Sequence, residues 1–213
     1  MAEPYQRQSA LAHLGLAARA AADREKSDAG VQLGERAFPG QLNLRGDPGN
    51  EEFMDAASGT VDCVLPTVPN TSAGEDDLEE GPRVLWLAPV EWLIVTAAGA
   101  EEALAGELVA AAAGCGGSVT DVSDARTVIV LQGPNARDVL MKGCPLDLHP
   151  DVFRPGHCAQ SLLARAAVIL YRRADEADGS ASFEIHVTRS FADYLWVWLE
   201  DAAGEYGVQV IEV

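Results

Sequence analysis

The sequence has few basic residues, no long apolar run and no recognisable leader, and each shortage excludes a class of protein. Only 15 Lys and Arg residues stand against 33 Asp and Glu residues, so the net charge is −18. A surface of this sign repels phosphate backbones and anionic membranes, and we expect no binding of nucleic acid or of a membrane. No window has the length of apolar sequence that spans a bilayer, and residues 1–8 lack the basic and apolar regions of a secretory signal. These observations predict a cytoplasmic protein.

Paired cysteines are also lacking. The four Cys residues are widely spaced and form no C-x-x-C motif, which is typical of reduced thiols in a cytosol. Two of them, Cys144 and Cys158, stand with His149 and His157 in the only cluster of metal-ligating residue types. Their spacing, C-x4-H-x7-H-C, matches no common zinc site, and adjacent His and Cys side chains point poorly at one ion. We therefore expect these residues to pack in a loop, without a metal.

Motifs of known catalytic chemistry are missing as well. The chain contains no G-x-S-x-G, no H-E-x-x-H and no P-loop, and Gly133 lacks the spacing of a dinucleotide-binding fingerprint. Asp121, Ser123 and Asp124 follow a predicted strand and are suited to holding a substrate amine. Asp and Ser at such a junction also bond to the local backbone, and we favour this second interpretation. The sequence predicts no catalytic, cofactor-binding or metal-binding residue.

What the chain does contain is an internal repeat. A strand that runs into a glycine and then a helix occurs at residues 44–54 and again at residues 131–141. The two segments align without a gap, with Leu, Gly and Met identical. A repeat on this scale predicts two similar supersecondary units packed as one body. Two further pairs of strand segments recur in the same order: residues 93–96 with 185–188, and residues 119–122 with 208–213.

Each half reads strand, helix, two or three strands, helix and strand, which is the split βαβ pattern of the ferredoxin-like fold. We therefore predict an α+β protein with two such units and antiparallel sheets. Ser190 and Asp193 have the spacing of a capping box at the start of the last helix. The predicted parts are a docking tail at residues 1–29, a first half at 30–122 with a mobile, solvated acidic loop at 66–82, and a second half at 123–213.

Aromatic residues gather on the last predicted helix. Phe191, Tyr194 and Trp198 lie on one arc, and a neighbouring arc consists of small and large apolar residues. A helix that lies on a sheet needs one apolar arc, so a second arc implies burial against another surface. Trp86 and Trp92 add large side chains to nearby strands. A thick aromatic core and a partner interface explain this pattern equally well, and these five residues are the interface candidates.

Four segments together resemble the gamma subunit of bacterial heterotetrameric sarcosine oxidase. The resemblance covers roughly residues 83–205 and is specific in order and spacing, while residues 1–80 match only loosely. That family is related to the folate-binding aminomethyltransferases of the glycine cleavage system, whose fold contains a ferredoxin-like duplication. The four segments are WLAPVEWL at residues 86–93, VTDVSDARTV at 119–128, GCPLDLHP at 143–150 and RSFADYLW at 189–196.

The resemblance implies a complex of four different subunits. In it the alpha subunit carries NAD and tetrahydrofolate, the beta subunit carries FAD and shares a covalent FMN with alpha, and the delta subunit holds zinc. The complex converts sarcosine to glycine by oxidative demethylation, with hydrogen peroxide and formaldehyde or 5,10-methylenetetrahydrofolate as products. The gamma subunit itself is implied to be non-catalytic and without a cofactor.

Three other functions remain open at this stage. The chain also fits the gamma subunit of a related enzyme that acts on dimethylglycine or N-methylglutamate. Alternatively, it is a free-standing folate-binding protein or an unrelated small-molecule module. The aminomethyltransferase pattern includes a catalytic aspartate and a folate-contacting glutamate, and neither has a clear counterpart here because residues 183–186 lack the accompanying glycines. A folate-binding protein requires a central pocket with a carboxylate aimed into it.

Overall fold

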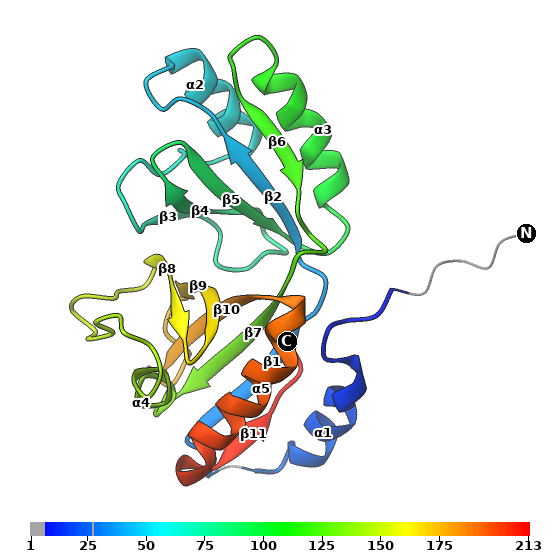
Figure 1. Ribbon diagram of the computed structural model, residues 1–213, viewed down its shortest axis with the longest axis vertical. Coiled ribbons are helices and arrows are strands. Elements are labelled where there is room, and N and C mark those ends of the chain that lie inside the picture. The colour runs from blue at the N-terminus through cyan, green and yellow to red at the C-terminus, as the bar shows by residue number, and fades with distance from the viewer. Residues whose placement is uncertain (1–6, 27) are drawn as a thin grey trace, which may run out of the picture.

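The chain forms two halves that are stacked along the long axis of the computed structural model (Figure 1). The structure describes residues 7–26 and 28–213, and within them the strands make one five-stranded and one six-stranded sheet. One face of each sheet packs on helices, and a third apolar cluster joins the two sheets. The first half contains β2 (Gly40–Arg45), β3 (Ser72–Gly74), β4 (Arg83–Ala88), β5 (Glu91–Thr96) and β6 (Ser118–Asp121), with helices α2 (Glu51–Thr60) and α3 (Glu101–Ala112).

The six-stranded sheet lies in the second half, with its helices nearby (Figure 1). Its strands are β1 (Val31–Arg36), β7 (Arg126–Gly133), β8 (Cys158–Leu163), β9 (Ala166–Arg172), β10 (Ala181–Thr188) and β11 (Val208–Val210). The helices are α1 (Leu16–Asp23), α4 (Ala136–Met141) and α5 (Arg189–Ala203), with short 3₁₀ turns η1 (Ala12–Leu14) and η2 (Gly204–Tyr206).

The strand order confirms the predicted duplication. In the first sheet the order is β3-β4-β5-β2-β6, so the strands of the βαββαβ unit are arranged β4-β5-β2-β6, as in a ferredoxin-like fold. In the second sheet β9, β10, β7 and β11 take the same places, but β1 is inserted between β7 and β11. The repeated sequence segments therefore occupy equivalent strands, with β2 matching β7, β5 matching β10 and β6 matching β11.

The position of β1 differs from the sequence-based expectation. The predicted first half begins at residue 30, whereas β1 pairs with β7 and β11 of the second half. Val31 lies opposite Val208 in parallel register, and Leu33 lies opposite Leu131 in antiparallel register. Local sequence predicts an extended segment from apolar and β-branched residues, but it does not say which sheet accepts that segment.

Two segments outside the repeat are anchored on the body of the protein. The amino-terminal segment is held by Leu11, which is fully buried in the core of the second half, and by Asp23, whose carboxylate accepts a hydrogen bond from the backbone of Val210 at 3.0 Å. The acidic segment at residues 66–82 is predicted to be a solvated loop, but part of it is ordered and buried. It contains β3, and Leu78 is buried between the two sheets.

Alternation along two strands explains how each sheet uses both of its faces. On β5, Trp92 and Ile94 face the helices α2 and α3, while Leu93 and Val95 face the second half. This continuous apolar run is typical of a strand that is covered on both sides. On β10, the odd-numbered residues 183–187 join the core under α5, and the even-numbered Glu184 and His186 face the space between the sheets.

The repeated glycines serve close packing. A Cβ atom at Gly46 would lie 2.2 Å from the ring of Phe53 on α2. Gly133 has a φ of +118° and its Cβ would lie 2.7 Å from the backbone oxygen of Gly30, so a side chain is excluded there on two grounds. Among the described helices, none is both long and apolar enough to cross a membrane.

Candidate functional site

Charged side chains cluster between the two sheets around the carboxylate of Glu184. Arg83 Nη1, from β4, donates to Glu184 Oε2 at 2.6 Å, and the two side chains are 1% and 0% exposed. Arg36 Nε and Arg173 Nε lie 3.3 and 3.8 Å from Glu184 Oε1, and His186 Nε2 lies 3.7 Å from Oε2. Because β4 and β10 belong to different sheets, this inter-sheet cluster connects the two halves.

The charges of the cluster fix its protonation. Burial acts to raise the pKa of Glu184, but the guanidinium of Arg83, together with those of Arg36 and Arg173, holds that pKa below its usual value. Burial lowers the pKa of His186 to about 4, because loss of water outweighs the attraction of Glu184. At neutral pH the cluster therefore contains an ionised glutamate and a neutral histidine.

The inter-sheet cluster extends to the acidic segment at residues 66–82. Asp76 accepts a hydrogen bond from the Tyr171 hydroxyl at 3.0 Å and pairs with Arg173 at 3.2 Å. The guanidinium of Arg83 lies 4.2 Å from the centre of the Tyr171 ring and donates to the backbone oxygen of Glu75 at 3.1 Å. These contacts hold the acidic segment against β9, in keeping with the burial of Leu78.

Glu184 lies on β10, within residues 183–186, the segment compared above with the folate-contacting stretch of aminomethyltransferases. Its side chain is wholly enclosed and its strongest partner is an arginine from the other half. A ligand reaches this carboxylate only if the ion pair with Arg83 breaks and the sheets separate. The geometry is therefore that of a structural tie between the halves.

The predicted interface residues separate into two groups. Phe191 and Tyr194 on α5 are 44% and 39% exposed and stack edge to face with ring centres 6.4 Å apart. Val197, one turn further along the same face, is 55% exposed. We call these three residues the exposed strip of α5. Its opposite face is buried through Ala192, Leu195, Trp196, Leu199, Ala202 and Ala203.

The tryptophans behave differently from this strip. Trp92 is fully buried, and its Nε1 donates to the backbone oxygen of Pro66 at 2.7 Å, so the prediction that it faces a partner is wrong. It is a core residue because β5 is covered on both sides. Trp86, opposite Trp92 in register, and Trp198 are half-buried. The Trp198 ring packs over Gly143, where a Cβ atom would approach it within 2.6 Å.

The polar group after β6 makes local bonds. Ser123 donates from its backbone and hydroxyl to Asp121 at 2.9 and 2.6 Å, and its hydroxyl accepts from the backbone of Gln41 at 2.9 Å. Asp124 pairs with Arg7 at 2.9 Å. These bonds fasten the connection between the two halves to β2, which agrees with the favoured structural interpretation.

The Cys and His residues near position 150 do not converge. Cys158 Sγ lies 3.3 and 3.5 Å from the backbone oxygens of Thr71 and Trp86, and burial raises the pKa of this thiol to about 12. Cys144 faces Ser161, and the His149 side chain is 63% exposed. Across residues 7–26 and 28–213, no three potential metal ligands come together.

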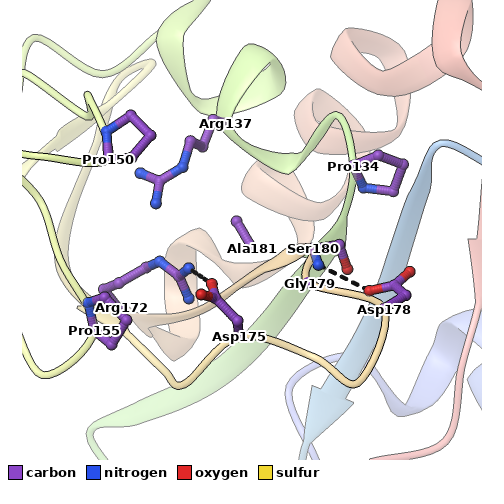
Figure 2. A pocket seen from close by; sticks show the side chains of 10 residues that line it. All are labelled: Pro134, Arg137, Pro150, Pro155, Arg172, Asp175, Asp178, Gly179, Ser180 and Ala181. Carbon is purple, nitrogen blue, oxygen red and sulfur yellow. Dashed lines mark hydrogen bonds and ion pairs between the residues drawn. The ribbon is translucent and has the colours of Figure 1, made fainter.

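A cleft of about 490 Å³ opens on the second half, between the start of α4, the loop after it and the turn before β10. Arg137 Nη1 donates to the backbone oxygen of Leu148 at 2.5 Å, and Arg172 pairs with Asp175. Figure 2 shows the Arg137 guanidinium directed into the space that these groups border. The lining residues are Pro134, Arg137, Pro150, Pro155, Arg172, Asp175, Asp178, Gly179, Ser180 and Ala181.

Sequence reasoning missed Arg83, Arg137 and Arg172. Two of them leave a weak signal, because Arg83 directly precedes and Arg172 directly follows an apolar strand segment, where a buried charge requires a partner. Glu184 and His186 leave the same signal in alternation with apolar residues. The pairing itself joins residues 101 positions apart, which no local pattern reveals.

The fold places the molecule in a class of two-unit proteins. It superposes on the glycine cleavage system aminomethyltransferase T from Bartonella henselae with a TM-score of 0.72, over 97% of this chain and 60% of that chain. The sequence identity is 18%, so this likeness concerns the fold. The duplicated ferredoxin-like arrangement is therefore shared with aminomethyltransferases.

The family follows from closer relatives. A chain of the heterotetrameric sarcosine oxidase from Corynebacterium sp. U-96 superposes with a TM-score of 0.81 at 36% identity, over 94% of this chain and 96% of that chain. The sarcosine oxidase subunit gamma of Corynebacterium sp. (strain P-1) is 39% identical over 85% of this chain and 84% of its own length. The gamma subunit family of sarcosine oxidase is matched over residues 45–205. The chain belongs to the sarcosine oxidase gamma subunit family.

Proposed function

We propose that the chain is the non-catalytic gamma subunit of a heterotetrameric, flavin-dependent sarcosine oxidase. The observation that carries the proposal is membership of the gamma subunit family, together with a structural relative whose solved complex is heterotetrameric. In this proposal FAD, FMN, NAD, tetrahydrofolate and zinc lie on the alpha, beta and delta subunits. The reaction is the oxidative demethylation of sarcosine to glycine.

The inter-sheet cluster supports a scaffold role. In an aminomethyltransferase-like fold, a folate role for Glu184 requires a carboxylate that is free to meet a ligand. Here that carboxylate is enclosed and bonded to Arg83. The same ion pair fixes one half relative to the other, which suits a subunit that presents a rigid surface to larger partners.

The exposed strip of α5 supports contact with a partner subunit. Its two aromatic side chains are held against each other by their edge-to-face contact, so little side-chain entropy is lost when a partner covers them. Aromatic anchors of this kind carry much of the binding energy at protein interfaces. We therefore assign the strip to the interface with the alpha or beta subunit.

Co-expression of the four subunits tests this assignment. The double variant Phe191→Lys/Tyr194→Lys places two charges in the strip and should lower recovery of the complex in affinity pull-down by about tenfold or more, because aromatic hot spots contribute about 2 kcal/mol or more each. Val109→Lys is the matched control, since Val109 is 56% exposed on α3 of the other half.

Two outcomes contradict the proposal. If the wild-type chain purifies as a stable monomer and ignores the other three subunits, the role of gamma subunit fails. If the wild type assembles and the double variant assembles equally well, only the assignment of the strip fails. Calorimetric titration of the isolated chain with tetrahydrofolate tests the alternative function, and a saturable heat would favour a folate-binding protein.

A further inference from the structure

The cleft of Figure 2 is lined by Arg137, for which the described residues supply no ion pair. Arg137 uses one guanidinium N–H for the backbone oxygen of Leu148. A guanidinium has five N–H donors, and within the described residues the other four find no acceptor and no carboxylate lies within ion-pair distance.

The second arginine of the cleft increases the positive charge around Arg137. The guanidinium carbons of Arg137 and Arg172 lie 5.4 and 5.2 Å from the centre of the same Phe183 ring. Burial, followed by the nearby charge of Arg172, lowers the pKa of Arg137, and the charge of Asp175 opposes this shift only in part. The terminal nitrogens of Arg172 are engaged, since its Nη1 donates to Ser182 O at 3.1 Å and its Nη2 pairs with Asp175, while its buried Nε has no hydrogen-bond partner among the described residues.

The two acids of the cleft are directed elsewhere. Asp175 pairs with Arg172, and Asp178 accepts from the backbone N–H of Ser180 at 2.8 Å. Pro150 and Pro155 also line the cleft and have no backbone N–H groups, so they add no donor to that of Arg137. The open space beside Arg137 thus lacks a hydrogen-bond acceptor. The planar guanidinium of Arg137 can donate two parallel N–H bonds, which match the two oxygens of a carboxylate.

We propose that this cleft is a binding site for a carboxylate, which Arg137 holds through its free N–H groups while Leu148 and Phe183 position the guanidinium. The site goes beyond the proposed subunit role and does not depend on it. The carboxylate has two sources, a small free acid or an acidic side chain of a partner subunit, and they are separated by experiment.

Nuclear magnetic resonance of the full-length chain tests the first source. Acetate and succinate are titrated separately while the Nε–Hε signal of Arg137 is followed. A saturable shift is expected, and Arg137→Gln should weaken the affinity measured on neighbouring backbone signals by about tenfold or more, since it removes a charge-assisted bond. Arg165→Gln is the matched control, because Arg165 is exposed in the β8–β9 turn.

The Arg137→Lys variant distinguishes a loss of carboxylate binding from a loss of stability of the fold. Lysine keeps the positive charge and can still reach the Leu148 oxygen, but it lacks the two-pronged donor, so binding should weaken while the circular dichroism melt stays unchanged. Loss of binding together with a lowered melting temperature in both variants would overturn the proposal, because Arg137 would then act only as a brace for the loop.

Chemical modification of the assembled complex tests the second source. Phenylglyoxal is applied to the free chain and to the complex, and modified arginines are counted by mass spectrometry. Protection of Arg137 but not of Arg165 in the complex supports a partner carboxylate. The proposal is overturned if neither acid shifts the Arg137 signal and Arg137 is modified equally in both states. If the chain joins no complex, the titration alone decides.

Discussion

Replacing Glu184 with glutamine should separate the energetic contribution of the inter-sheet cluster from that of the surrounding core. The substitution keeps the shape of the side chain and removes its charge. At the observed 2.6 Å, the attraction between Arg83 and Glu184 is about 6 kcal/mol for an effective dielectric constant of about 20. The cost of removing both ions from water offsets much of this attraction in the wild type.

In Glu184→Gln the attraction to Arg83 is lost, whereas the arginines are still held out of water at the same cost in free energy. Three guanidinium groups then lose the buried anion that they share, and only the carboxylate of Asp76 remains, beside Arg173 and Arg83. Breaking a buried pair in this way costs about 3–5 kcal/mol. We expect Glu184→Gln to lower the free energy of unfolding by about 3 kcal/mol, at the lower end because the amide oxygen still accepts from Arg83. A loss of this size is a large part of the about 5–15 kcal/mol typical of a folded domain.

Urea unfolding at pH 7.5, followed by tryptophan fluorescence, measures this change. Glu102→Gln is the control, because Glu102 is exposed on α3 and its replacement should alter stability by about 0.5 kcal/mol or less. The double variant Arg83→Met/Glu184→Leu should be more stable than the sum of the two single changes predicts. The reasoning is refuted if Glu184→Gln matches the control or if the two single effects simply add.

Three further changes test other parts of the structure. The pKa of His186 is lowered to about 4 in the folded chain, so between pH 6.5 and 4 the unfolded chain binds a proton that the folded chain does not. As the pH is lowered from 6.5 to 4, the free energy of unfolding should therefore decrease by about 3 kcal/mol more in the wild type than in His186→Gln. Equal pH dependence of the two urea unfolding curves would contradict this. Leu11→Ala should cost about 2–5 kcal/mol in the same assay, whereas a neutral effect would show that the amino-terminal segment contributes little to the core. Gly46→Ala should cost about 1–3 kcal/mol because its methyl group overlaps the Phe53 ring, while Gly59→Ala, with no atom within 4 Å, should not destabilise.

Local patterns in the sequence predict the elements well and their long-range partners poorly. The segment at residues 93–96 is predicted as a strand because its apolar run is unambiguous, and β5 confirms it. The capping box predicted from Ser190 and Asp193 is wrong. α5 begins at Arg189 with Thr188 before it and has no side-chain cap, and Asp193 instead pairs with His13 at 2.9 Å. The spacing was correct, but a distant residue competes for the carboxylate.

The candidate sites show the same division. Phe191 and Tyr194 are identified from helical periodicity because exposure of a second apolar arc is a local property. Arg137 is distinguished by the lack of an acidic partner, and Glu184 by an ion pair with Arg83 of the other sheet. Both features are visible only in three dimensions. Trp92 is misassigned for a related reason, since its burial depends on a helix and a loop that the strand sequence does not encode.

The insertion of β1 between β7 and β11 determines the order in which the second half can be completed. During synthesis β1 emerges early, yet both of its neighbours in the sheet emerge much later, and β11 is formed by residues 208–210 near the end of the chain. Until then β1 presents open edges that invite pairing with other chains. Contacts of such large sequence separation slow folding. The second half therefore cannot be completed before β11 has been synthesised, and deleting residues 208–210 would leave β1 with one edge unpaired.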